Sequence, residues 1–387
     1  MQQGSHHHLC LQLPITIITT TSSNQPPSCC GVKRRTRNMG FWLEVGHGNV
    51  EKKRRNTTMI VKIAVAVVGG FLGWVYMRIK PPPSKICGSL GGPPVTSPRV
   101  RLNDGRHLSY REWGVSKDEA KYKVIVSHGF NSSKDLQLPL SQELIEELQI
   151  YVLFFDRAGY GESDPHPKRT IKSEAFDIQE LADKLQIGPK FYVIGLSMGA
   201  YAIWRASLIV PFVNYWWPCL PADLAKESFG LLLAQDRWTF RVAHYAPWLF
   251  QWWMNQKLFP SLSMLAGIMD MFSQSDLEFL KNLPPNSDDN QEKIRQQGDY
   301  ESLYRDTMAG YGKWEFDPFD ITNPWPDNNG AAHIWQGYED KIIPYKINRF
   351  LSEKLPFVRY HEVPGRGHFL AFQDGICDEI FRALLVG

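Results

Sequence analysis

Short apolar runs alternate with longer amphipathic segments from about residue 120 to residue 200. The short runs are rich in β-branched and aromatic residues, which is typical of buried strands. The longer segments place apolar residues at the three- and four-residue spacing of a helix. This pattern predicts strands at 124–127, 151–155 and 191–194, with helices at 140–148 and 174–185.

The alternation of strand and helix predicts an α/β fold with a mostly parallel sheet and helices on both of its faces. Apolar runs predict further strands at 208–210, 333–335 and 358–363. Ahead of this region, residues 100–102 and 107–112 flank an Asp-Gly turn signal, and we expect them to form two antiparallel edge strands.

Residues 214–330 have a different character, with many aromatic side chains and Pro-rich breaks. So long a loop without structure of its own is implausible, so we expect a helical lid inserted into the core formed by 99–213 and 331–387. The aromatic residues of the lid suit a water-poor pocket for lipophilic groups, or they simply pack the lid helices together. They are Tyr215, Trp216, Trp217, Trp238, Trp248, Trp252, Trp253 and Trp314.

An apolar run at 59–77 is a candidate transmembrane anchor near the short end of the usual length. Lys62 lies near one end, where its long side chain can reach the interface, and Trp74 and Tyr76 lie at the other end as interfacial aromatics do. We expect an uncleaved single-pass anchor, in an endomembrane. A signal or transit peptide and a buried helix of a soluble protein are the alternatives.

The segments around this run differ in composition. Residues 1–58 are basic and polar, which predicts disorder, and residues 78–98 form a Pro- and Gly-rich linker. Basic residues are more numerous before the run than after it, so the amino terminus is expected in the cytosol and the folded domain on the far side.

The composition of the 387-residue chain is that of a folded enzyme, with 43% hydrophobic residues and a net charge of only +3. A nucleic-acid-binding surface usually carries a basic stripe interleaved with aromatic residues. The sequence has no such stripe, so we expect no nucleic-acid partner. Metal-ligand spacings are absent from the sequence, and the six cysteines form no disulfide framework. We therefore expect no cofactor and no metal, and the oligomeric state stays open.

Residues 195–199 read Gly-Leu-Ser-Met-Gly and directly follow the predicted strand at 191–194. A sharp strand-to-helix turn of this kind needs glycines on both sides and exposes the serine hydroxyl. Ser197 is therefore the candidate nucleophile.

A serine nucleophile needs a base, and the base needs a group that orients it. Asp340 and His368 each follow a predicted strand, where the loops of a parallel sheet converge on one crevice. Glu339 competes with Asp340, and the spacing from the strand favours Asp340. Among the eleven histidines, His361 falls inside the last strand, and we expect His244 in the lid and His333 in the core.

Stabilisation of the oxyanion in acyl transfer requires two donors. A strand ends in His128-Gly129-Phe130, so the backbone N–H groups of Phe130 and Met198 are the candidate oxyanion hole.

Together these motifs resemble the α/β-hydrolase fold family from about residue 99 to the end, specifically plant hydrolases of monoacylglycerol-lipase and esterase type. The resemblance rests on His128 to Phe130, Gly195 to Gly199, Gly337 to Asp340, Gly367-His368, and the segment Asp156 to Ser163. It implies Ser197, Asp340 and His368 as the triad, Phe130 and Met198 as the oxyanion hole, and a structural role for residues 156–163.

One feature departs from the family. Residues 198–205 leave room for barely two helical turns before the next strand, whereas the resemblance implies about a dozen more residues there, and a parallel crossover needs about ten to twelve. A deletion at this point would weaken or abolish activity, or shift the register of the next strand.

Two functions of different class follow. The first is a membrane-tethered serine hydrolase that cleaves a small lipophilic ester through an acyl-enzyme. The second is a non-catalytic or receptor-like relative that binds a small lipophilic ligand beneath the lid.

Overall fold

A computed structural model describes residues 47–203, 207–282, 288–325, 330–373 and 375–387. The chain divides into two units, residues 1–66 and 67–387, and each is described by itself. Helix α1 (His47–Ile79) begins before the predicted anchor at 59–77 and continues slightly beyond it. Residues 47–58 of the segment predicted to be disordered belong to α1, and residues 1–46 of that segment lie outside the described residues.

Within α1, the stretch Thr57–Ile79 is long and apolar enough to cross a membrane. Its large apolar side chains are exposed, Ile60 at 64% and Leu72 at 59%. Such a surface would be unfavourable in water, which is why length and composition together mark this stretch as a candidate span.

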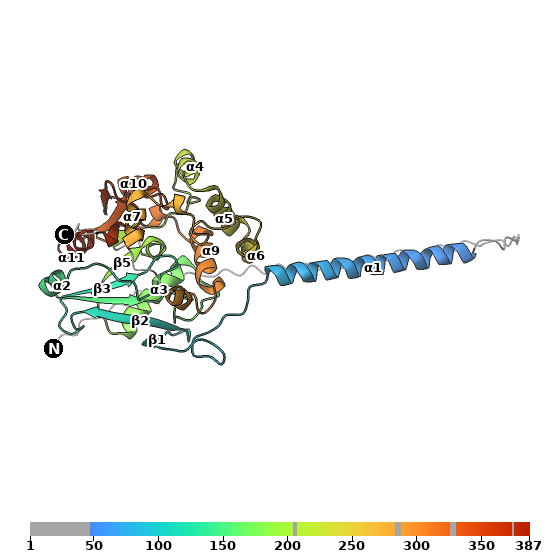
Figure 1. Cartoon of the computed structure of the whole chain (residues 1–387), viewed down its shortest axis with the longest axis horizontal. Helices are drawn as coiled ribbons and strands as arrows, with labels where there is room; N and C mark the ends of the chain where they lie inside the picture. Colours follow the sequence, from blue (N-terminus) through green and yellow to red (C-terminus); the bar gives the residue numbers. More distant parts are fainter. Residues whose placement is uncertain (1–46, 204–206, 283–287, 326–329, 374) are drawn as a thin grey trace, which may run out of the picture. The chain divides into compact units, whose positions relative to one another are not determined.

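The second unit contains an eight-stranded sheet in the order β1-β2-β4-β3-β5-β6-β7-β8 (Figure 1). Strands β1, β2 and β4 pair antiparallel, and all pairs from β4 to β8 are parallel. The sequence placed both antiparallel strands at an edge, which is wrong for β2, because β2 pairs with β1 on one side and β4 on the other. The strands are β1 (Arg99–Arg101), β2 (His107–Gly114), β3 (Tyr122–Ser127), β4 (Ile150–Phe155), β5 (Tyr192–Leu196), β6 (Ser207–Ile209), β7 (Ala332–Gly337) and β8 (Val358–Val363).

Helices cover both faces of the sheet. Successive residues of a strand point to opposite faces, and in β3 Val124 packs in one apolar cluster while Ile125 packs in the other. Helices α2 (Gln142–Leu148) and α11 (Ile376–Leu385) contribute to the cluster of Val124. The cluster of Ile125 includes residues of α3 (Ile171–Lys184) and α10 (Tyr345–Lys354). This is the predicted α/β architecture.

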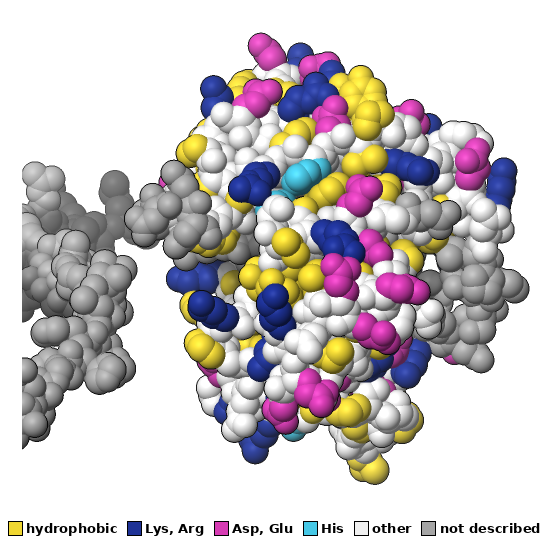
Figure 2. Space-filling model, turned by 90° about the vertical axis from the view of Figure 1, so that its left-hand side faces the viewer, with side chains coloured by type: hydrophobic (Ala, Val, Ile, Leu, Met, Phe, Trp, Pro, Cys, Tyr) yellow, Lys and Arg dark blue, Asp and Glu magenta, His cyan; other side chains and the backbone are white. Residues whose placement is uncertain are grey.

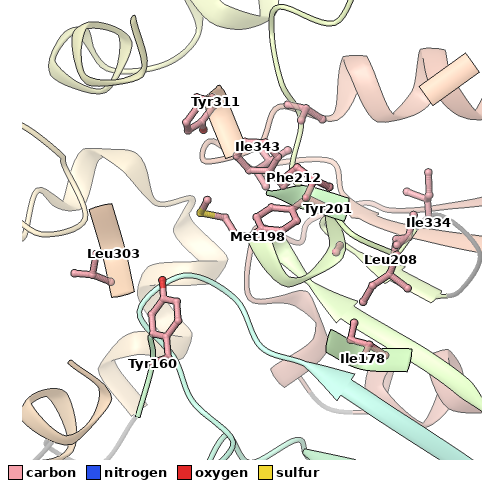
Figure 3. Packing of buried hydrophobic residues seen from close by; sticks show 14 of the residues in the cluster. Tyr160, Ile178, Met198, Tyr201, Leu208, Phe212, Leu303, Tyr311, Ile334 and Ile343 are labelled. Atoms are coloured by element: carbon pink, nitrogen blue, oxygen red, sulfur yellow. The ribbon is translucent and has the colours of Figure 1, made fainter. Parts of the chain in front are cut away.

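The chain between β6 and β7 is helical, as predicted. Figure 3 shows side chains of the cluster in which this insertion meets the core: Tyr311 comes from the insertion, and Phe212, Met198 and Ile343 come from the core. We refer to the insertion as the cap. Its described elements are α4 (Ala222–Gly230), α5 (Ala234–Tyr245), η2 (Pro247–Leu249), α6 (Phe250–Asn255), η3 (Met269–Met271), α7 (Gln274–Asn282), α8 (Asp288–Ile294), η4 (Tyr300–Tyr304), α9 (Arg305–Tyr311) and η5 (Pro318–Asp320).

The crossover from β5 to β6 is short, as the sequence indicates. In place of the two helical turns expected at 198–205, the structure has the single 3₁₀ turn η1 (Ser197–Ala200), and residues 204–206 lie outside the described residues. The two strands still pair in parallel register. Beside β5 the sheet face has a hollow of about 460 Å³, lined among others by Ile178, Phe191 and Val193.

Charged side chains of both signs are interspersed with apolar ones on the face of the molecule drawn in Figure 2. No large area of a single charge gathers on the part of that face that the structure describes.

Candidate active site

Ser197 occupies a strained turn at the end of β5, with φ +50°. Close packing around the turn explains the two glycines. A Cβ on Gly195 would lie 2.5 Å from the Cα of Ala200, and one on Gly199 would lie 2.3 Å from the carbonyl oxygen of Ser127. Real Cβ atoms do not approach other atoms so closely, so a side chain at either position would displace the serine.

The structure brings together the three residues that the sequence proposed as a triad. The His368 Nε2 atom lies 3.1 Å from the Ser197 Oγ atom, and the His368 Nδ1 atom lies 2.8 Å from the Asp340 Oδ2 atom. Asp340 follows β7 and His368 follows β8, so neighbouring parallel strands deliver both side chains to the same edge. Glu339 is exposed.

Asp340 is held in place by its other oxygen. Its Oδ1 atom accepts hydrogen bonds from the backbone N–H groups of Ile342 at 2.8 Å and Ile343 at 2.9 Å. Burial works against the charged form of His368, but the carboxylate of Asp340 outweighs it, so the pKa of His368 is raised. A raised pKa makes the imidazole a stronger base, which suits removal of a hydroxyl proton.

His128 fixes the turn that carries the candidate oxyanion donor Phe130. The His128 Nδ1 atom lies 2.8 Å from the carbonyl oxygen of Gly129, and its Nε2 atom accepts the backbone N–H of Arg157 at 3.0 Å. Burial holds the pKa of His128 well below its ordinary value, so the ring is neutral and can donate with one nitrogen and accept with the other. No role for this histidine was predicted from the sequence.

The other histidines that the sequence weighed lie away from Ser197. His361 is on the edge strand β8, where its ring stacks on Trp335 at 4.1 Å, and its Nε2 atom lies 3.0 Å from the Nδ1 atom of His333. His244 is in α5 and stacks on Trp216.

A cavity of about 100 Å³ opens next to Ser197. Most of its wall is apolar, and the exposed side chains of Asp270 and Lys341 also line it. Phe130 and Met198, the proposed oxyanion residues, lie in its wall with Ser197. The remaining lining residues are Phe212, Leu231, Leu232, Leu233, Asp236, Phe240, Leu262, Met264, Met271, Thr307, Tyr311, Ile342 and Ile343.

A buried ionic cluster ties the cap to the core behind this cavity. Asp306 of α9 pairs with Arg157 and Arg169 of the core, and it accepts hydrogen bonds from the hydroxyls of Tyr160 and Tyr201, each at 2.7 Å. The two arginines outweigh burial and hold the pKa of Asp306 far below its ordinary value. Tyr201 directly follows η1, so the cluster also fixes the short crossover after Ser197.

Comparison with known proteins agrees with this architecture. The profile of the alpha/beta hydrolase family matches residues 124–377, which include Ser197, Asp340 and His368. This chain belongs to the alpha/beta hydrolase family. The match covers the sheet from β3 onward and the whole cap.

Individual relatives of this alpha/beta hydrolase are distant. It is similar to an esterase from Thermogutta terrifontis, with 20% identity, a TM-score of 0.47, and coverage of 75% of this chain and 98% of the esterase. It is also similar to an enol-lactonase from Burkholderia xenovorans, with 16% identity, a TM-score of 0.48, and coverage of 75% of this chain and 100% of the lactonase. The thiohydrolase AneE of Aspergillus aculeatus is 35% identical over 51 residues, 13% of this chain, and the chain spans only 16% of that curated relative.

Proposed function

We propose that this alpha/beta hydrolase is a serine hydrolase of carboxylic esters. In this proposal Ser197 is the nucleophile, His368 the general base, and Asp340 the residue that orients and stabilises His368. The backbone N–H groups of Phe130 and Met198 bind the oxyanion. The observation that carries the proposal is the relay of short contacts from Ser197 Oγ through His368 to Asp340, 3.1 and 2.8 Å long.

The reaction then runs in two halves. The Ser197 Oγ atom attacks the ester carbonyl carbon as its proton passes to His368 Nε2. The tetrahedral oxyanion then collapses, and the proton passes from His368 to the alkoxide leaving group. The alcohol departs, and Ser197 remains acylated. Water then attacks the acyl carbon while His368 takes its proton, and that proton returns to Ser197 Oγ as the carboxylic acid leaves.

The wall of the cavity supports a neutral, lipophilic acyl substrate. Phe212, Phe240 and Met271 are buried, and all three line the cavity beside Ser197. Burial raises the pKa of Asp236 in the same wall, which means that a charged group is disfavoured there. An anionic acyl tail would face both the apolar wall and this carboxyl group.

The test uses the full chain with short p-nitrophenyl esters and a fluorophosphonate probe. We expect hydrolysis and covalent labelling at Ser197 in the wild-type protein, and neither in Ser197→Ala. Because Ser352 lies outside the cavity and its hydroxyl binds the carbonyl of Arg349, Ser352→Ala is the control that keeps both activities. Absence of turnover and labelling in the wild-type protein contradicts the proposal.

We also propose that Thr57–Ile79 anchors the enzyme in a membrane. The exposed apolar surface of this helix supports it. The full chain should co-sediment with phosphatidylcholine vesicles and resist alkaline extraction. Replacing Val65 and Val68 by Arg in the middle of the apolar stretch should release it, since central arginines are unfavourable in a bilayer.

The short crossover favours a second candidate function. With only η1 behind Ser197, a receptor-like relative could bind a lipophilic ligand in the same cavity without hydrolysing it. The outcome that supports this alternative is a ligand-dependent rise in melting temperature that is equal in wild type and Ser197→Ala, with no turnover in either.

A further inference from the structure

A second buried carboxylate, Asp276, approaches the His368 loop from the cap. Asp276 lies in the first turn of α7 and is completely buried. Its Oδ1 atom accepts the backbone N–H of Phe369, the residue after His368, at 2.9 Å. This contact could not be predicted from the sequence, because residues 276 and 369 are far apart in the chain.

The other oxygen of Asp276 takes part in a helix cap. Its Oδ2 atom accepts the backbone N–H of Ser273 at 3.1 Å and the Ser273 hydroxyl at 2.7 Å. In return, the Ser273 Oγ atom accepts the backbone N–H of Asp276 at 3.2 Å. This reciprocal arrangement is a capping box. A cap needs one carboxylate oxygen, so it does not account for the contact with Phe369.

The two segments fit each other closely. A Cβ on Gly367 would lie 2.1 Å from both the Asp276 Oδ2 atom and the Ser273 Oγ atom, so the glycine lets α7 reach the loop. On the other side of His368, the ring of Phe369 lies 5.8 Å from that of Phe272 and 5.5 Å from that of Phe279. The loop is therefore held by the cap at both neighbours of His368.

The charge of Asp276 has no cationic side chain within ion-pair distance in the part of the chain that the structure describes. Burying a carboxylate without a cation is costly unless hydrogen bonds or a nearby charge compensate. Three hydrogen bonds do part of this, and the start of α7 adds its dipole. The positive charge that arises nearby is the imidazolium that His368 becomes during catalysis.

We propose that Asp276 is a positioning residue that holds the His368 loop through Phe369 and favours the protonated state of His368 in the reaction. The proposal deepens the serine-hydrolase function and rests on it. It also makes the catalytic base depend on the cap, because the carboxylate belongs to α7. Consistent with this, the charges that raise the pKa of His368 against burial are those of Asp340 and Asp276.

The decisive variant is Asp276→Asn, which keeps an oxygen for Phe369 and removes the charge. Loss of a negative neighbour makes the imidazolium less stable, so the pKa of His368 falls. We expect the acid limb of kcat/KM to move about half a unit to one unit lower in pH. At pH 8 we expect kcat/KM to fall about tenfold.

Ser273→Ala is the matched control, since it removes both hydrogen bonds of the Ser273 hydroxyl in the helix cap but leaves the carboxylate. It should lower the melting temperature as much as Asp276→Asn or more, and leave the acid limb in place. If Asp276→Asn lowers stability or rate without moving the acid limb, Asp276 is only part of the cap and the proposal is wrong. Asp276→Ser, which is smaller and also uncharged, carries the same expectation where the asparagine variant does not fold.

Titration of the His368 ring by NMR in histidine-labelled protein tests the proposal without any substrate. The midpoint should lie lower in Asp276→Asn than in wild type and Ser273→Ala. A lower midpoint in a protein without esterase activity would support Asp276 and contradict the proposed function. An unchanged midpoint in an active esterase would contradict the role of Asp276 and support the proposed function.

Discussion

Two halves of the cap are attached to the molecule in different ways. The inner half, residues 273–311, is fixed to the core by buried polar contacts: Asp306 binds Arg157, and the Gly161 N–H donates to the carbonyl of Ile294 at 2.8 Å. In the outer half, residues 222–255, α5 packs on α9 of the inner half, and α4 packs on the core helix α10. Phe240 of α5 stacks on Tyr311 at 3.8 Å.

The surfaces of the two halves differ accordingly. The outer half exposes large apolar side chains, such as Trp238 at 58%, Tyr245 at 68% and Trp248 at 64%. In Figure 1, α5 and α6 lie at the outside of the cap, with α9 nearer the sheet. The difference teaches a division of labour: the inner half holds the loop that carries His368, and the outer half contributes a group of side chains to the cavity wall. They are Leu231, Leu232, Leu233, Asp236 and Phe240.

The largest effect on stability is expected from a variant that breaks the attachment of the inner half to the core. Asp306→Ala leaves two buried arginines with Glu174 as their remaining carboxylate. Leaving buried charges uncompensated should cost about 3–5 kcal/mol in the free energy of unfolding, measured with urea.

The control for this variant is Asp223→Ala, at an exposed position of α4 in the outer half, which should cost no more than about 0.5 kcal/mol. Equal losses in the two variants would show that the halves are attached alike.

A change in the outer half should alter substrate preference as well as stability. Phe240→Leu places a smaller side chain in the cavity wall, which enlarges the cavity, and it reduces the contact with Tyr311. We therefore expect a loss of about 1–2 kcal/mol in the free energy of unfolding. The ratio of kcat/KM for long over short acyl esters should rise about tenfold. Phe279→Leu in the inner half is the matched control, because Phe279 contacts Phe369 and not the cavity. An unaltered acyl ratio in Phe240→Leu contradicts the division of labour.

The two halves should respond to pH with opposite signs. Burial raises the pKa of Asp236 in α5, so its ionised form reduces stability at neutral pH, and this cost disappears as pH falls through the raised pKa. Arg157 and Arg169 lower the pKa of Asp306, so its stabilising charge is present above about pH 4 and is lost only in stronger acid.

Asp236→Asn should therefore be more stable than wild type at pH 7, by on the order of 1 kcal/mol, with the difference shrinking toward pH 4. Its amide oxygen can still accept the Ser263 N–H, which lies 2.7 Å from the Asp236 Oδ1 atom. Denaturant unfolding at several pH values measures this. A difference that grows in acid would reverse the assigned sign.

The smallest effect is expected at the exposed surface of the outer half. Trp248→Ser removes a side chain that is 64% exposed, so the melting temperature in the absence of membranes should barely change, corresponding to less than about 0.5 kcal/mol. Trp217→Ser is the contrasting variant, because Trp217 is 4% exposed and should cost several times more. A large loss of stability in Trp248→Ser would mean that this exposed side chain helps to stabilise the outer half.

The sequence predicted the order of strands and helices well, because apolar periodicity and turn signals are local. The fold class is confirmed. The proposed catalytic roles of Ser197, Asp340 and His368 stay predictions, although glycines and strand ends led to side chains that the structure brings within hydrogen-bond reach.

What could not be predicted depends on contacts between distant residues. Asp276 and Asp306 look like ordinary helical acids in the sequence, and only the folded cap places them against Phe369 and Arg157. The inner position of β2 likewise follows from its pairing with β4, which no local signal encodes.

The hollow beside β5 has a consequence for how the protein could change. Phe191 and Val193 line about 460 Å³ of space on one face of the sheet, next to the point where the crossover passes. If the chain were longer by a helical turn or two between residues 203 and 207, the added residues could pack in this hollow. Lengthening the chain at this point should be tolerated, and it would give the nucleophile a firmer support.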